Sequence, residues 1–432
     1  MGRVWELAKR IYPLNRSISS EDNLKTLEII REYIGKLDIK YWDIGESFSS
    51  WEIPKGWKCK NAWIIDENNK KYCDFKKRNL RVTSFSIPIN RVVKWSELKD
   101  HLHYSKKLEA HQYPYTTSYY NADWGFNVTY EEYKKLENQK CQVFIDSEFQ
   151  DDCPMHYGEF IYEGKTKKEI LLTTYICHPS MGNNETSGMC VASELARKLI
   201  EKKQIYEYSI RIIFIPETIG SIFYLRDNLH DLKKNAVLGF VLTCLGDNSK
   251  SFSIPLTYKK KGILEKCLNS LELSGYIFKK YPAEDRGSDE RQFSWPTVGL
   301  DFTSISKSKY HEYPQYHSSS DDLTFISEDS LNESCELVEN IIKSTSNNKK
   351  IKTITIGEPF LMSLDLGAKI GGLLHNKHKK DIGTDLINVL WYSNGNNDTF
   401  DISLLLKLEF FYILELQDLC LNKGLAILSN DI

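Results

Sequence analysis

Four residues whose side chains can bind a metal or move a proton each follow a short apolar segment in the middle of this 432-residue sequence. They are His178, Glu217, Asp247 and His317. Imidazole and carboxylate groups are the usual ligands of catalytic zinc, which lowers the pKa of a bound water toward ~7. A further carboxylate beside that water can accept its proton. These residue types therefore favour hydrolysis by a metal-activated water.

The apolar segments that precede these residues predict how they are positioned. Four nearly continuous apolar stretches of strand length lie at 169–177, 209–216, 236–246 and 298–306. Such stretches are typical of strands covered on both faces, and the residues from Ala192 to Leu199 repeat with helical spacing between the first two. The pattern predicts an α/β fold with a mostly parallel sheet and helices on both faces. A single histidine at the end of a strand is more often structural than functional. Ligands bind where parallel strands end, however, so polar groups at several successive strand ends favour a ligand-binding site.

The composition is that of a folded protein without a strong overall charge. Hydrophobic residues make up 41% and charged residues 27%, which excludes disordered and fibrous classes. Lys and Arg number 57 against 59 Asp and Glu, so no net field attracts nucleic acid or an anionic membrane. The N-terminal residues show no signal-peptide pattern, and the ten cysteines have no zinc-binding spacing. We expect a cytoplasmic protein with neither a membrane nor a nucleic-acid partner.

Changes in residue pattern divide the chain into three parts. Residues 1–45 and 136–345 carry the strand and helix patterns of the expected α/β domain. Residues 46–135, rich in tryptophan and short β-type segments, are expected to form an inserted β domain. A polar segment at 344–352 is the expected linker, and residues 346–432 fit a winged-helix-like module.

The order of these motifs resembles that of a known enzyme family. The matching residues are His178, Asn184-Glu185-Thr186-Ser187-Gly188, Pro216-Glu217, Gly220-Ser221 and Tyr316-His317. The pattern resembles the zinc aminopeptidase family that also contains glutaminyl cyclases. It is more closely similar to a branch often encoded among surface-polysaccharide genes, through the segments 12–17, 51–57, 117–120, 124–126, 175–181, 216–221, 287–293 and 316–321. The resemblance implies a three-layer aminopeptidase-like core with a mixed sheet, an inserted β domain and a C-terminal winged-helix domain.

The chain departs from the family pattern at positions that bind metal. In the family the first histidine binds one zinc and an aspartate bridges two zincs; His178 matches the first, but Asn184 replaces the aspartate. A glutamate pair supplies the general base and then a ligand in the peptidases. Here Glu217 matches the base, whereas Thr218 stands at the ligand position.

Two further ligand positions complete the comparison with the family. Thr243 stands near the place of another aspartate ligand, with Asp247 four residues on, and His317 matches the last histidine. The candidate metal ligands are therefore His178, His317, Asp247 and Asn184. Two zinc ions roughly 3.5–4 Å apart need a bridging anion. Because the amide of Asn184 carries no charge, we expect at most one tightly bound zinc per chain.

The segment 287–293 resembles the family segment that lines the substrate pocket. The resemblance implies that Asp289 holds an amine, that Arg291 binds a carboxylate, and that Tyr316 lies beside the substrate. An exposed ion-pair loop is the alternative for the 287–293 segment. Residues 117–120 with Trp124 are expected either to form an aromatic wall of the site or to pack in the core.

Two functions from different classes are compatible with these observations. The first is a metal-dependent hydrolase that cleaves an amide next to a free amine in a small-molecule or short peptide-like substrate; a link to surface-polysaccharide biosynthesis rests on the resemblance alone. The second is a non-catalytic homologue that binds an aminoacyl or sugar-linked ligand, which the neutral residues at ligand positions suggest. A DNA-binding regulator would rest only on the winged-helix-like end, and the near-neutral charge argues against it. A homo-oligomer is compatible with the sequence.

Overall fold

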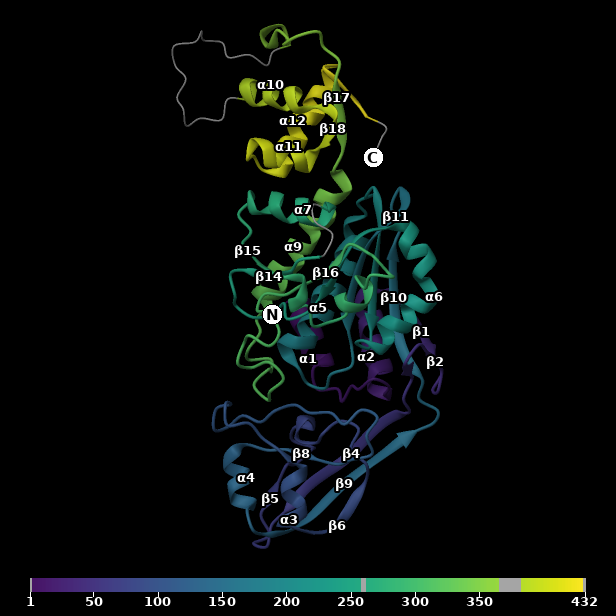
Figure 1. Cartoon of the computed structure of the whole chain (residues 1–432), viewed down its shortest axis with the longest axis vertical. Coiled ribbons are helices and arrows are strands. Elements are labelled where there is room, and N and C mark those ends of the chain that lie inside the picture. The colour runs from purple at the N-terminus through teal and green to yellow at the C-terminus, as the bar shows by residue number, and fades with distance from the viewer. Residues whose placement is uncertain (1, 258–261, 365–381, 430–432) are drawn as a thin grey trace. The chain divides into compact units, whose positions relative to one another are not determined.

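The computed structural model describes residues 2–257, 262–364 and 382–429 (Figure 1). Contacts divide the chain into two compact units. The first contains Met1–Tyr258 and Lys279–Val338, and the second contains Lys259–Phe278 and Glu339–Ile432. Each unit is described by itself.

A six-stranded sheet forms the centre of the first unit (Figure 1). Its strands, in spatial order, are β1 (Asp38–Trp42), β10 (Met155–Tyr162), β12 (Tyr208–Ile215), β11 (Thr166–Tyr175), β13 (Ala236–Leu242) and β16 (Phe302–Ile305). β11 pairs in parallel with β12 and β13, and β13 pairs in parallel with β16. β10 pairs antiparallel with β1 and β12. The four apolar segments are thus the four parallel strands, and the mixed α/β fold is confirmed.

Helices cover the two faces of this sheet (Figure 1). The helices on one face are α1 (Arg3–Ile11), α2 (Glu21–Ile34) and α5 (Ser187–Lys202), and those on the other are α6 (Ile219–Asn235) and α8 (Glu290–Phe293). Another helix, α9, spans Glu328–Asn347. The start of α2 is set by Ser20, whose side chain accepts a hydrogen bond from the Asn23 N–H, and its end by Gly35 with φ 88°.

A smaller antiparallel sheet interrupts the α/β part of the first unit. Its strands, in spatial order, are β5 (Lys71–Tyr72), β4 (Gly56–Ile65), β9 (Lys140–Gln150) and β6 (Ile89–Lys94), with the helices α3 (Trp95–Leu98) and α4 (Tyr130–Leu136). The inserted sheet therefore reaches Gln150, past the expected boundary at residue 135. The reason is that Cys141, Val143 and Ile145 alternate with less buried residues, as in a strand with one face on a core.

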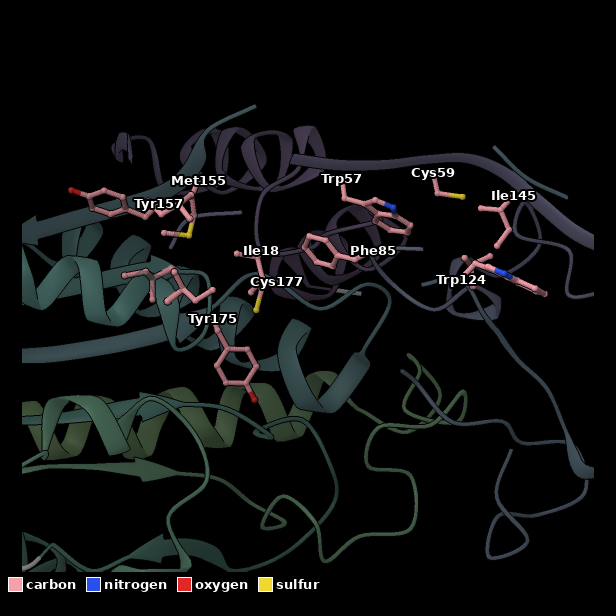
Figure 2. Packing of buried hydrophobic residues seen from close by; sticks show 14 of the residues in the cluster. Ile18, Trp57, Cys59, Phe85, Trp124, Ile145, Met155, Tyr157, Tyr175 and Cys177 are labelled. Carbon is pink, nitrogen blue, oxygen red and sulfur yellow. The ribbon is translucent and has the colours of Figure 1, made fainter. Parts of the chain in front are cut away.

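One apolar core joins the inserted sheet to the end of β11 (Figure 2). Trp57 of β4 stacks near Phe85 with ring centroids 5.9 Å apart, and its indole N–H donates to the Ser86 carbonyl at 3.0 Å. The same cluster contains Tyr175 and Cys177, which lie within three residues before the candidate residue His178. The inserted sheet thus supports the edge at which the predicted site lies.

The second unit combines a three-stranded antiparallel sheet with helices. It contains α7 (Ile263–Glu272), β17 (Lys350–Thr353), α10 (Ile382–Tyr392), β18 (Asn394–Asp398), α11 (Thr399–Leu406), α12 (Phe410–Asn422) and β19 (Ala426–Leu428). β17 lies between β18 and β19. Lys266 of α7 donates to Asp398 at 3.1 Å and to Asp401 at 2.8 Å. The winged-helix assignment stays a prediction, and residues 365–381 of that module lie outside the described residues.

The polar segment 344–352 is not the expected linker. It forms the end of α9 and the start of β17, and Ser344 and Thr345 are fully buried. The Ser344 hydroxyl donates to the Ile341 carbonyl at 3.1 Å, so a polar side chain can lie inside the helix packing.

The remaining strands are short. They are β2 (Ser47–Phe48), β3 (Trp51–Glu52), β7 (Leu102–His103), β8 (Phe126–Asn127), β14 (Phe252–Pro255) and β15 (Phe278–Tyr281). Among the described residues, none of the helices combines the length and the apolar character that crossing a membrane would require.

Candidate active site

His178 follows the carboxyl end of β11, and its imidazole is held by one carboxylate. Its Nδ1 lies 2.9 Å from Oε2 of Glu185, and its backbone N–H donates to the same oxygen. Its Nε2 lies 3.9 Å from Oε2 of Glu217. Burial alone would lower the pKa of His178, but the Cys177 sulfur and the Glu185 carboxylate raise it well above its ordinary value. The ring is oriented through Nδ1, and Nε2 is presented toward Glu217.

Glu185 is held by a cation from the N-terminal segment. Nε of Arg16 lies 3.2 Å from Oε1 of Glu185, and neither side chain is exposed. Arg16 also donates to the backbone carbonyl of Ile11. The carboxylate of Glu185 therefore serves His178 and Arg16, and it does not replace the missing bridging aspartate.

His317 reaches the same place from the loop that follows β16. Its ring centroid lies 5.4 Å from that of His178, and the ring stacks on Tyr316 at 4.0 Å with an interplanar angle of 11°. Its Nε2 is buried and has no hydrogen-bond partner among the described residues. Burial lowers the pKa of His317 well below its ordinary value, and the charge of His178 adds to this effect. A neutral imidazole with a free nitrogen is what a metal ligand requires.

Glu217 lies between β12 and α6, at the same edge of the sheet. Its Oε1 accepts a hydrogen bond from the Ser288 hydroxyl at 3.0 Å, and its Oε2 faces His178. Burial raises the pKa of Glu217, although the His178 charge opposes this. The side chain still keeps 20% of its surface exposed, so a substrate can reach it. A reachable carboxyl group with a raised pKa suits a general base.

Asn184 belongs to a ring of neutral hydrogen bonds in the turn Gly182–Thr186, which precedes α5. Its Nδ2 donates to the Tyr175 hydroxyl at 2.9 Å, and that hydroxyl lies 2.5 Å from Oγ1 of Thr243. Thr243 in turn donates to the Asn184 backbone carbonyl at 2.8 Å. Oδ1 of Asn184 is buried without a partner among the described residues. Two positions at which the resemblance implies acids thus form a neutral network here, with one amide oxygen left free.

Asp247, expected as a metal ligand, is engaged by the loop around it. Oδ1 accepts hydrogen bonds from the Ser249 N–H and the Ser308 hydroxyl, and Oδ2 accepts from the Ser308 N–H and the Asn183 side-chain amide. Four donors satisfy both oxygens, so the carboxylate closes a loop and offers no open coordination position. The prediction that Asp247 binds metal is therefore not supported by its surroundings.

Asp289 does not line a surface that an amine could reach. Its side chain is fully buried, and Oδ1 accepts a hydrogen bond from the Thr218 N–H at 2.7 Å. Burial and the nearby Glu217 carboxylate raise the pKa of Asp289. Asp289 therefore holds the backbone beside Glu217. Because its carboxyl group is buried, the prediction that it binds a substrate amine is not supported.

Arg291 and Tyr316 lie next to the residues that form the site. Arg291 donates to the Thr218 hydroxyl at 3.1 Å and to the Ser288 carbonyl at 2.9 Å, and it is only partly buried. Tyr316 covers one face of the His317 ring. Their contact with a substrate stays a prediction.

Tyr115, from the inserted part, is the aromatic residue that sequence reasoning missed. Its ring centroid lies 5.6 Å from that of His178 and 5.5 Å from that of His317. Its N–H donates to the His317 carbonyl at 2.8 Å. Trp124, which was expected in an aromatic wall, is buried and stacks on His101 at 3.8 Å. Trp124 thus fits the core-packing alternative, whereas Tyr119 lies close enough to His178 and Glu217 for their charges to affect its pKa. No periodic signal distinguishes Tyr115 from its neighbours.

Comparison with known proteins places this arrangement in a family. Residues 5–348 match the model described as Domain of unknown function (DUF4910). The chain belongs to the DUF4910 family. It is 35% identical over 417 residues, covering 95% of this chain and 92% of the relative, to a Clostridium acetobutylicum protein described as a polysaccharide biosynthesis protein with aminopeptidase-like domain.

Solved structures share the fold of this DUF4910 chain. A crystal structure described as a peptidase from Clostridium acetobutylicum superposes with a TM-score of 0.88 at 32% identity, covering 99% of this chain and 96% of the other. BSAP, a zinc aminopeptidase from Bacillus subtilis, superposes with a TM-score of 0.58 at 15% identity, covering 79% and 94%. The aminopeptidase-like fold expected from the motifs is confirmed.

Several side chains of this DUF4910 site carry atoms that can serve as metal ligands. Among the described residues, Cys177, His178 and Glu185 bring one ligand atom each within 4.8 Å of one another. Burial raises the pKa of the Cys177 thiol, however, and Glu185 already pairs with Arg16. The free nitrogen of His317 and the Nε2 of His178 are the better donors. The two rings lie 5.4 Å apart by their centroids, but among the described residues His178, His317 and Glu217 do not bring three ligand atoms within 4.8 Å of one another.

Proposed function

We propose that this chain is a metal-dependent, aminopeptidase-like hydrolase that cleaves an amide bond next to a free amine. The observation that carries the proposal is the placement of Glu217 Oε2 3.9 Å from His178 Nε2. The ring of His317, whose Nε2 has no partner among the described residues, lies 5.4 Å from the His178 ring by their centroids. When bound by the two histidines, a divalent ion would supply Lewis acidity toward water and the scissile carbonyl.

Glu217 supplies the proton transfer in this mechanism. Ser288 holds Oε1, so Oε2 is the oxygen that accepts a proton as water adds to the carbonyl carbon. The C–N bond then breaks, and Glu217 returns the proton to the departing nitrogen. Arg291, which lies beside Thr218, and Tyr316, which lies beside His317, are the residues that we assign to substrate contact.

The substrate class is proposed from chemistry and from the described relative. The aminopeptidase-like fold supports a small or short peptide-like substrate with a free amine. The Clostridium acetobutylicum relative, described as a polysaccharide biosynthesis protein, supports an amide attached to a surface-polysaccharide precursor. A cytoplasmic location fits the supply of such a precursor.

A binding protein without catalysis is the second candidate. The specific observation in its favour is the ring formed by Asn184, Tyr175 and Thr243, which contains no negative charge. Such a protein would recognise an aminoacyl or sugar-linked ligand at the same edge and leave the amide intact.

Glu217→Gln separates these two candidates. With zinc supplied and a panel of aminoacyl p-nitroanilides as probe, the unmodified chain should release p-nitroaniline, and E217Q should lower kcat by about 10²–10⁴-fold because it removes the general base. Glu284→Gln, at an exposed acid in a neighbouring loop, is the matched control and should keep full activity. Equal rates in the unmodified chain and E217Q would contradict the proposal, and no hydrolysis by the zinc-loaded unmodified chain would favour the binding protein.

A further inference from the structure

A buried ion pair lies behind His178, on the side away from Glu217. Arg16 and Glu185 are 169 residues apart in the chain, and Nε and Oε1 meet at 3.2 Å. Both side chains have no exposed surface. A buried carboxylate without a cation is strongly disfavoured, so the guanidinium of Arg16 accounts for the presence of a carboxylate at this position.

The second oxygen of Glu185 receives two donors from one residue. Oε2 accepts the backbone N–H of His178 and lies 2.9 Å from Nδ1 of its ring. Because both donors belong to His178, the carboxylate sets the rotation of the ring as well as the nitrogen that carries a proton. The remaining neighbour of Nδ1 among the described residues is Sγ of Cys177 at 3.5 Å, which already accepts the Glu217 N–H at 3.3 Å. Sulfur is a weak acceptor, so Glu185 is the dominant partner.

We propose that Arg16 and Glu185 are positioning residues for His178. Arg16 holds the carboxylate of Glu185, and Glu185 accepts a hydrogen bond from the Nδ1–H group of His178. Nε2 of the neutral ring then carries the lone pair, which faces Glu217. The inference deepens the proposed function and rests on it, because Nε2 is the atom assigned to the metal. It also gives a role to the segment 12–17, whose match to the family carried no function. Partners of this kind typically change metal affinity by 10–100-fold.

The test reads the tautomer of His178 directly, in the metal-free full-length chain. Ring ¹⁵N shifts of His178, measured above the pH at which the ring becomes neutral, should show a protonated Nδ1 and an unprotonated Nε2. Glu185→Leu should move the proton to Nε2, which is the preferred tautomer of an unpartnered neutral imidazole. The double variant R16M/E185L removes both charges together, so it leaves no lone buried charge and should show the same shift in a folded chain.

Cobalt affinity provides a second readout. E185L and R16M/E185L should bind Co²⁺ about 10–100-fold more weakly than the unmodified chain, and R16K, which keeps the cation, should lose less. Glu169→Gln is the matched control, because Glu169 forms another buried ion pair, with Arg211 at 2.9 Å, away from His178. It should leave the His178 shifts and the Co²⁺ affinity unchanged.

Two results would overturn the inference. One is a neutral His178 in the unmodified chain that carries its proton on Nε2. The other is a His178 tautomer that stays the same in both E185L and R16M/E185L. A Glu185-dependent tautomer in a chain that binds no metal would support the positioning role while contradicting the proposed function, so the two failures are distinguishable.

Discussion

Neutral side chains at three positions set the chemistry around His178 and His317. These residues are Thr243, Asn184 and Thr218. The Thr243 hydroxyl donates a hydrogen bond to the Asn184 backbone carbonyl, and the Thr218 hydroxyl accepts one from Arg291. No carboxylate in this set can bridge two divalent ions, whose mutual repulsion needs an anion between them. Under the proposed function, we therefore expect at most one ion at this site.

Asn184→Asp tests whether the missing negative charge at position 184 limits metal binding. The new carboxylate should raise zinc affinity at least tenfold, because an anion would lie where Oδ1 of Asn184 is now buried and unpartnered. Without metal the same change should lower the free energy of unfolding by about 1–3 kcal/mol, since a buried charge would lack a cation. Asn121→Asp, at an exposed asparagine, controls for the added charge. Zinc titration and urea denaturation measure both effects, and an unchanged zinc affinity in N184D would count against the assignment.

Residue types at strand ends could predict that His178, Glu217 and His317 lie at one edge, and the structure brings them together there; their catalytic and metal-binding roles stay a prediction. The same logic failed for Asp247, since proximity to a strand end does not set the direction of a side chain. Serine donors of the surrounding loop hold that carboxylate. Arg16 was out of reach for a different reason, because its partner Glu185 lies 169 residues away and no local pattern connects them.

Strands with uniform burial are the elements that the sequence predicted best. β11 is continuously buried from Glu169 to Tyr175, and β12 is buried along most of its length, as expected of strands covered on both faces. β9 is the contrasting element: its alternating burial marks a one-sided strand, and it pairs with β4 and β6 in the inserted sheet. Polar residues within 344–352 were misleading because hydroxyl groups can be satisfied inside a helix.

Two glutamates on the strands that flank β12 should differ in how much their substitution changes stability. Burial alone would raise the pKa of Glu159 on β10, but hydrogen bonds from Lys40 and Tyr224 and the Arg211 charge bring it below its ordinary value. Burial raises the pKa of Glu169 on β11, and Arg211 only partly opposes this. E159Q should therefore cost about 3 kcal/mol of unfolding free energy at pH 7. E169Q should change it by less than about 1 kcal/mol.

The pH dependence of these variants follows from the directions of the two shifts. The stabilisation from Glu159 is present above its ordinary pKa and is lost as the pH falls through the lowered one, so E159Q and the unmodified chain should converge in acid. The ionised form of Glu169 is disfavoured by folding, so E169Q should gain stability relative to the unmodified chain as the pH rises from about 4 to 7. Urea denaturation at both pH values measures this. A larger loss for E169Q than for E159Q at pH 7 would refute it.

At the scale of the whole molecule, the site depends on residues from three stretches of the first unit that are distant in sequence. The N-terminal segment provides Arg16, the inserted part provides Tyr115, and the α/β core provides His178 and His317. The resemblance to aminopeptidases predicted the aminopeptidase-like α/β fold correctly because its motifs are spread along the chain. The contacts between these stretches depend on tertiary packing, and the sequence pattern could not supply them.

The number of zinc ions per chain tests the central claim most directly. Metal analysis after equilibration with excess zinc should find one tightly bound ion in the unmodified chain and none in H178A or H317A, because each variant removes one of the two imidazole ligands. His111→Ala, at an exposed histidine with 72% of its side chain accessible, should keep the ion. Two tightly bound zinc ions in the unmodified chain, or one ion retained in both H178A and H317A, would contradict a single site held by His178 and His317.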